Sequence, residues 1–148
     1  ITIILLDDYQ LRRKLTSQLA AEFGRRVVHE ITAPESNGVI LCSYTWWLQC
    51  HHQLPTPEQL ILAILPFPSL ELPLISARVN SFKKQGRDWF RELLLPEVLS
   101  LIPYLVEPIR GKKGRIAILD GRLRSRSWGR IVLSALEPWR PLDHLLPN

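Results

Sequence analysis

The chain has 148 residues, a length typical of one domain and sufficient to bury a hydrophobic core. Hydrophobic residues make up 46% and charged residues 22%, which is ordinary globular usage. No apolar run is long enough to span a bilayer, so no membrane role is expected, and the net charge of +5 favours an acidic partner. The chain opens directly on an apolar run without a leader peptide or an initiator methionine, which we interpret as the middle of a longer protein.

The hydrophobic pattern predicts five strands separated by helices. The first strand, residues 1–6, is apolar on both faces, as in a parallel sheet covered on each side. Further strands are predicted at residues 26–31, 38–44, 60–65 and 115–120. Such strand–helix alternation predicts an α/β fold, with a mainly parallel sheet of about five strands and helices on both faces.

Helix signals lie between these strands. Asp7 and Asp8 supply capping side chains, and leucines recur at helical spacing up to Gly24. A second helix is predicted from Leu74 to Lys84, and a third begins near Asp88. Pro96 is expected to open a separate helix at its first turn, and a last helix is predicted at residues 127–136.

Basic residues are concentrated late in the chain. Between positions 110 and 130 there are eight, against the single acid Asp120: Arg110, Lys112, Lys113, Arg115, Arg122, Arg124, Arg126 and Arg130. Such a segment suits a phosphate backbone, although a solvated helix face would give the same composition. Charge alone does not decide between the two.

The sequence offers little support for a metal centre or a nucleophile. Cys42 lies in an apolar run, and two cysteines cannot build a disulfide framework, so a reducing cytoplasm is expected. Cys50, His51 and His52 are consecutive and rarely converge on one ion, so no metal is predicted. No base or triad accompanies Ser43.

Several phrases, in order along nearly the whole chain, resemble the C-terminal RecA-like domain of DinG and XPD helicases of superfamily 2. The strongest is LILAILPFPSLELP at residues 60–73, similar to the strand and LPF-x-x-P-x-x-P turn of that family. GRIAILDGR at residues 114–122 resembles its G-x-x-x-x-x-D-x-R strand end, and RSWGR at residues 126–130 the step beyond it. Residues 3–11 resemble motif IV, and residues 39–55 resemble motif V.

Two of the resembling motifs depart from the family pattern. The family's motif VI reads Q-x-x-G-R-x-x-R and its arginines complete the ATP site, whereas residues 97–110 contain no glutamine and only one arginine, Arg110. Motif V keeps its aromatic pair, Trp46 and Trp47, without the acidic and glycine positions that follow. Because an arginine finger accelerates phosphoryl transfer strongly, this loss predicts weakened ATP hydrolysis.

The resemblance implies that residues 1–148 form one second motor domain of an ATP-dependent DNA helicase. No GxxxxGK[ST] loop occurs, so ATP and Mg²⁺ would be held mainly by an N-terminal motor domain of the same polypeptide, and this chain alone would be inactive. The expected partner is single-stranded or forked DNA. The alternative is a degenerate, non-hydrolysing module that binds nucleic acid or docks a protein.

Candidate site residues follow from the same interpretation. Arg110 is the candidate remnant of motif VI that would reach a phosphate, although an ordinary surface arginine would look the same. Asp120, at a strand end, is expected near the motor cleft, where it could also pair with Arg122 or cap the next turn. The expected DNA contacts are Trp46, Trp47, Arg122, Arg124, Arg126 and Arg130. On an extended stretch, one tryptophan of the adjacent pair would stack on bases and the other would lie in the core.

Overall fold

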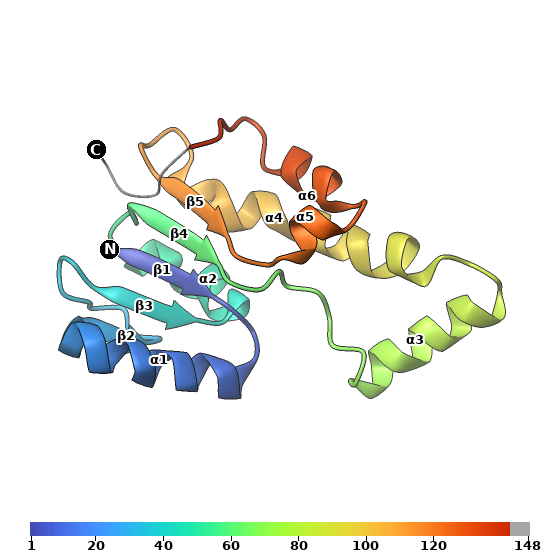
Figure 1. Cartoon of the computed structure of the whole chain (residues 1–148), viewed down its shortest axis with the longest axis horizontal. Coiled ribbons are helices and arrows are strands. Elements are labelled where there is room, and N and C mark those ends of the chain that lie inside the picture. Colours follow the sequence, from blue (N-terminus) through green and yellow to red (C-terminus); the bar gives the residue numbers. More distant parts are fainter. Residues whose placement is uncertain (143–148) are drawn as a thin grey trace.

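A computed structural model describes residues 1–142 of the chain (Figure 1). They form one five-stranded sheet in which all neighbouring strands are parallel. The spatial order is β2 (Val27–His29), β3 (Val39–Cys42), β1 (Thr2–Leu5), β4 (Gln59–Leu62) and β5 (Arg115–Ile118). The predicted α/β class and the parallel sheet are therefore confirmed.

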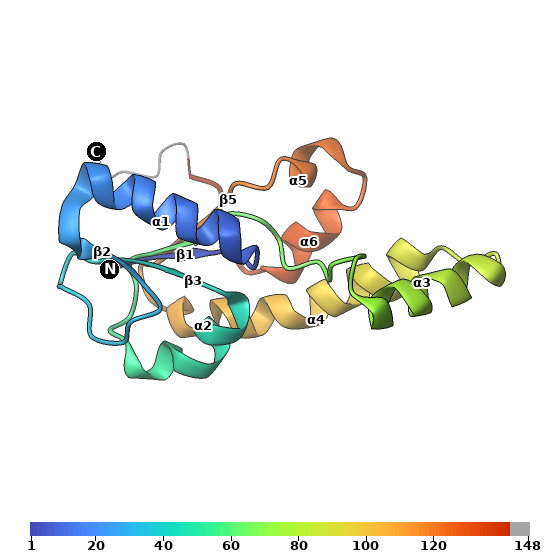
Figure 2. The ribbon, with the colours of Figure 1, turned by 90° about the horizontal axis from the view of Figure 1, so that it is seen from below.

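Helices cover both faces of the sheet (Figure 2). α1 (Tyr9–Phe23) lies on one face, and α2 (Tyr44–Cys50) and α4 (Leu95–Val106) lie on the other. This arrangement follows from the sequence of β1, whose successive side chains point to opposite faces. Ile3 and Leu5 join the larger core beneath α2 and α4, whereas Ile4 joins the smaller core beneath α1.

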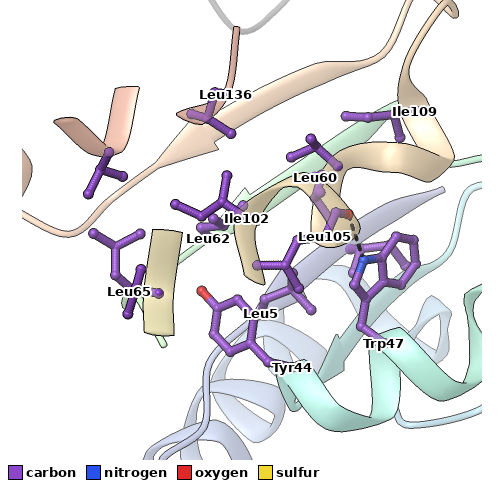
Figure 3. Packing of buried hydrophobic residues seen from close by; sticks show 14 of the residues in the cluster. Leu5, Tyr44, Trp47, Leu60, Leu62, Leu65, Ile102, Leu105, Ile109 and Leu136 are labelled. Carbon is purple, nitrogen blue, oxygen red and sulfur yellow. Dashed lines mark hydrogen bonds between the residues drawn. The ribbon is translucent and has the colours of Figure 1, made fainter. Parts of the chain in front are cut away.

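The larger core is closed by two aromatic residues of α2 (Figure 3). Trp47 is 0% exposed, and its indole N–H donates to the Leu105 carbonyl at 2.9 Å, which ties α2 to α4. Tyr44 packs beside Leu5 and Leu65, and its hydroxyl donates to the Ile64 carbonyl at 2.6 Å. Both indole and phenol therefore have a hydrogen-bond partner although they are buried.

α1 begins and ends as the sequence predicts. The Asp8 carboxylate accepts from the Leu11 amide at 2.9 Å, and the helix ends at Gly24, whose φ of 78° lies in the left-handed region that favours glycine. The predicted leucine stripe is only partly buried: Leu15 and Leu19 pack on the sheet, whereas Leu11 is exposed.

The helix predicted near Asp88 and the helix predicted at Pro96 form one continuous run. α3 (Pro73–Lys84) is followed by a π-helical turn, Phe90–Leu94, that leads directly into α4. Pro96 lies in the first turn of α4, as predicted, but α4 continues the preceding π-helical turn and is not a separate helix. A proline lacks the N–H for its i−4 carbonyl, and the wider preceding turn accommodates that loss without breaking the helix.

α3 projects beyond the carboxyl ends of the strands (Figures 1 and 2). It is held by a small separate core in which Val79 packs with Leu93 and Leu94 of the π-helical turn. Phe67 and Phe90 belong to the margins of both this core and the larger one. They therefore join the projecting helix to the body of the domain.

After β5 the structure has two short helices, α5 (Arg122–Ser125) and α6 (Gly129–Ala135), where one was predicted at 127–136. Gly129 begins α6 because no larger residue fits: a Cβ there would lie 1.8 Å from the Leu123 carbonyl oxygen. Among residues 1–142, no helix combines the length and the apolar composition that crossing a membrane requires.

Candidate nucleic-acid interface

The loops after all five strands lie at one edge of the sheet, because the strands are parallel. This carboxyl edge is the side on which open α/β sheets place their ligands. α3, α5 and α6 lie beyond it, whereas the loop before β5 lies at the opposite, amino edge (Figure 1). The position of each candidate residue relative to these two edges decides which of them can act together.

Asp120 follows β5 at the carboxyl edge, and its side chain is 6% exposed. One oxygen accepts from the Leu65 amide at 3.1 Å, and the other accepts from the Arg122 amide at 3.1 Å. The Arg122 guanidinium donates to both oxygens, at 2.6 Å from Nη2 and 2.9 Å from Nε. Burial opposes ionisation, but the hydrogen bonds from Arg122 and from the two amides outweigh it and lower the pKa of Asp120. Asp120 therefore both pairs with Arg122 and caps the following turn.

Arg122 also covers an aromatic cluster. Its guanidinium carbon lies 5.1 Å from the centre of the Phe67 ring, within cation–π range. The Phe67 ring lies 5.1 Å from Trp128 and 5.3 Å from Phe90, so segments after β4, before α4 and before α6 meet here. The pairing with Asp120 raises the pKa of Arg122, so its charge is permanent.

The remaining predicted arginines of the carboxyl edge have free charges. Arg124, Arg126 and Arg130 are exposed, and within residues 1–142 none of the three makes an ion pair or a side-chain hydrogen bond. Arg91 of the π-helical turn lies against the same loop, since its Nη2 donates to the Ser127 hydroxyl at 2.6 Å. These four arginines offer cationic groups on the side of the domain where a ligand would be expected.

The basic segment at 110–130 does not form one surface. Arg115 begins β5 and its amide donates to the Glu58 carbonyl, so Arg110, Lys112 and Lys113 lie at the amino edge. The four residues of β5, about 13 Å of extended chain, separate them from Arg122. Sequence proximity therefore overstates the size of the basic surface.

Arg110, the candidate remnant of motif VI, is tied to the C-terminal end of α6. Its Nη2 donates to the Leu136 carbonyl at 3.1 Å, and the residue is half-buried. A carbonyl at a helix C-terminus is a favourable partner for a guanidinium. Arg110 precedes β5 and therefore lies toward the amino edge, whereas Asp120 and the free arginines follow β5 at the carboxyl edge.

Trp46 and Trp47 lie on a helix rather than on an extended stretch, so that expectation is wrong. The Ser43 hydroxyl accepts from the Trp46 amide at 3.0 Å and begins α2. Trp47 is the core member of the pair and has no ring face open to a base. Trp46 is half-buried at the margin of the same core, which leaves part of its ring accessible.

One polar network at this edge was not predicted from the sequence. Arg12 is buried although it lies on α1: its Nη1 donates to the Leu6 carbonyl at 2.8 Å, and its Nε donates to His29 Nε2 at 3.1 Å. Its Nη2 lies 3.9 Å from the Glu30 carboxylate. Burial and the Arg12 charge lower the pKa of His29 despite the opposing charge of Glu30, which suits its role as a neutral acceptor. Its burial was not predicted, because the leucines of α1 indicate the face of the helix that packs on the sheet.

Metal-binding chemistry is not assembled in the part of the chain that the structure describes. Residues 1–142 contain no group of three or more His, Cys, Asp or Glu side chains that could hold an ion. His51 packs against Trp47, with ring centres 5.5 Å apart, rather than converging with Cys50. Cys42 is buried, and burial raises the pKa of its thiol well above the ordinary value.

The fold and this edge define an α/β domain of RecA-like architecture that has no phosphate loop of its own. No protein-family model matches the chain. The chain is 26% identical over 135 residues to the ATP-dependent DNA helicase YoaA of Haemophilus influenzae, covering 89% of this chain and 21% of that protein. It is also 26% identical over 137 residues to the ATP-dependent DNA helicase YoaA of Escherichia coli, covering 90% and 22%.

A third relative is more similar over a shorter stretch. The 3'-5' exonuclease DinG of Bacillus subtilis is 39% identical over 75 residues, which cover 49% of this chain and 8% of that protein. The resemblance to DinG-type helicases is thereby confirmed, and the chain is a relative of the DinG and YoaA proteins. It spans about a fifth of the length of the YoaA helicases it matches.

Proposed function

We propose that this chain is the second motor domain of an ATP-dependent DNA helicase and acts, in the cytoplasm, with an N-terminal motor domain of the same polypeptide. The observation that carries the proposal is its likeness, over about nine-tenths of its length, to two proteins named ATP-dependent DNA helicases. The first domain would hold ATP and Mg²⁺, since this chain contains no phosphate loop. By itself the chain would neither hydrolyse ATP nor unwind DNA.

The DNA path of this proposal runs along the carboxyl edge. Arg124, Arg126 and Arg130 are exposed there, without partners among the described residues, and Arg91 lies beside them. A cation without a protein partner can contact a phosphate at no cost to an existing ion pair, which sets Arg124, Arg126 and Arg130 apart. Arg122 is paired with Asp120, and the Arg91 Nε lies 3.8 Å from the Asp88 carboxylate. Trp46 remains a candidate for base stacking, whereas the enclosed Trp47 does not.

We expect the chain to bind single-stranded DNA weakly, without sequence preference, and with affinity that falls as salt rises. Replacing Arg124 and Arg126 with glutamine should weaken binding and reduce the salt slope by about 1.4, or about 0.7 for each lost phosphate contact. Fluorescence anisotropy of a labelled oligothymidine, titrated at several NaCl concentrations, measures both quantities.

Two matched controls remove the same number of charges elsewhere. Lys83→Gln/Lys84→Gln lies at the end of α3, and Lys112→Gln/Lys113→Gln lies at the amino edge. Both should keep the wild-type slope. Equal losses in all three double variants would mean that only net charge matters and that the proposed DNA path is wrong.

A non-hydrolysing scaffold is the second candidate, and one observation favours it. In the segment that resembles motif VI, the solvent side of α4 carries Pro103 and Tyr104, and the one arginine, Arg110, is bonded to Leu136. ATP hydrolysis by the protein that contains this domain, measured with and without single-stranded DNA, separates the two functions. A motor requires DNA-stimulated hydrolysis, whereas a scaffold binds DNA without it.

A further inference from the structure

The Asp120 carboxylate is fully engaged within the domain. Its two oxygens accept hydrogen bonds from the Leu65 amide, the Arg122 amide and the Arg122 guanidinium, and the side chain is almost completely buried. Leu65 follows β4 and Arg122 begins α5. One carboxylate therefore joins the exits of the two neighbouring strands.

Arg122 differs from the other arginines of α5 and of the loop that follows. One edge of its guanidinium is occupied by Asp120, and the group lies over the Phe67 ring at 5.1 Å. Arg124, two residues later, is exposed and makes no side-chain contact of this kind within residues 1–142. The two arginines belong to the same four-residue helix, yet only Arg124 has its charge available.

We propose that Arg122 is a positioning residue rather than a DNA contact, and that its pairing with Asp120 fixes α5 against the exit of β4 so that Arg124 and Arg126 face the DNA. This inference rests on the proposed function and refines it. The pair also holds Phe67 within the aromatic cluster that joins the projecting α3 to the domain. The exposed arginines and α3 thus have a common anchor.

Positioning and direct contact predict opposite signs for one substitution. Asp120→Asn removes a negative charge near the proposed DNA path, so electrostatics alone would tighten binding. If the carboxylate instead anchors α5, its loss weakens binding. Arg122→Lys likewise keeps the charge but loses the two-pronged pairing that the planar guanidinium provides.

The experiment compares oligothymidine binding by wild type, Asp120→Asn, Arg122→Lys, the double variant, and Arg124→Gln as a direct-contact control. We expect Asp120→Asn and Arg122→Lys each to weaken binding roughly tenfold, with the double variant no weaker than either single variant because both act through one pair. Arg124→Gln should instead lower the salt slope by about 0.7. Unchanged or tighter binding by Asp120→Asn, or wild-type affinity in Arg122→Lys, would overturn the proposal.

A measurement without DNA keeps the inference testable if the proposed function fails. Exchange of the amide hydrogens of Leu65, Phe67 and residues 122–126 should accelerate in Asp120→Asn and Arg122→Lys but not in Arg124→Gln. Absence of DNA binding by the wild type would reject the proposed function. Unchanged exchange in both pair variants would reject the anchoring role itself, whether or not the chain binds DNA.

Discussion

Replacing Trp47 with alanine should lower the free energy of unfolding by about 3–5 kcal/mol, as large aromatic-to-alanine changes in cores do. Trp47 is completely enclosed beneath α4, so the substitution leaves a cavity that the surrounding helices cannot fill. It also removes the indole donor to the Leu105 carbonyl. Because domains are typically stable by about 5–15 kcal/mol, this loss is a large fraction of the total stability.

The neighbouring residue provides the control. Trp46→Ala deletes the same side chain from a half-buried position, and no hydrogen bond of its indole is found within residues 1–142. Chemical denaturation followed by circular dichroism should show a loss well below that of Trp47→Ala. Similar losses at the two positions would contradict the placement of Trp47 in the core and of Trp46 at its margin.

Gly129→Ala should destabilise the domain by about 3 kcal/mol, at the upper end of the usual cost of overpacking. The added Cβ would lie 1.8 Å from the Leu123 carbonyl oxygen and 2.8 Å from its carbon. Both atoms belong to the backbone of α5, so neither can move aside as a side chain would. The thermal unfolding midpoint is the measurement.

Gly121 lies eight residues earlier and serves as the matched control. A Cβ there would meet nothing within 4 Å, and its φ of −61° is open to any residue. Gly121→Ala should therefore leave the midpoint unchanged or raise it slightly, since alanine restricts the unfolded chain. An equal loss at both glycines would show that the close approach of α5 to α6 does not occur.

Local patterns predicted the strands well, because burial on both faces leaves a direct signature. Residues 1–6 are apolar at every position except Thr2, and β1 occupies the centre of the sheet with neighbours on both sides. Gly24 and Asp8 likewise marked the ends of α1 through backbone and capping chemistry that acts locally. Prediction succeeded where the determining contacts lie within a few residues of each other.

Prediction failed where contacts distant in the sequence decide the outcome. Trp46 and Trp47 were predicted to lie on an extended stretch, but they lie on α2. Trp47 packs against α4 and donates to Leu105, almost sixty residues later in the chain. Arg12 lies in a leucine-rich helix and is buried because carbonyls of the preceding turn and His29 satisfy its guanidinium. No helical periodicity reveals such partners.

The candidate site shows the same division. Composition identified a cluster of basic residues, but β5 lies in the middle of this segment. The basic residues before β5 lie at the amino edge of the sheet, and those after it lie at the carboxyl edge. Arg122 and Arg124 were equivalent in the sequence, and only the carboxylate of Asp120 distinguishes them. The sequence resemblance indicated the family, and the structure shows that Arg122 is paired whereas Arg124 is exposed.

We propose that single-stranded DNA follows the carboxyl edge of this domain, and photo-crosslinking can locate the bound strand on the chain. An oligonucleotide carrying a photoreactive thymidine analogue is irradiated with the wild-type chain, and the attached peptides are identified by mass spectrometry. We expect attachment within residues 122–130 and at the π-helical turn around Arg91. Attachment confined to residues 110–115 at the amino edge, with residues 122–130 unmodified, would contradict it.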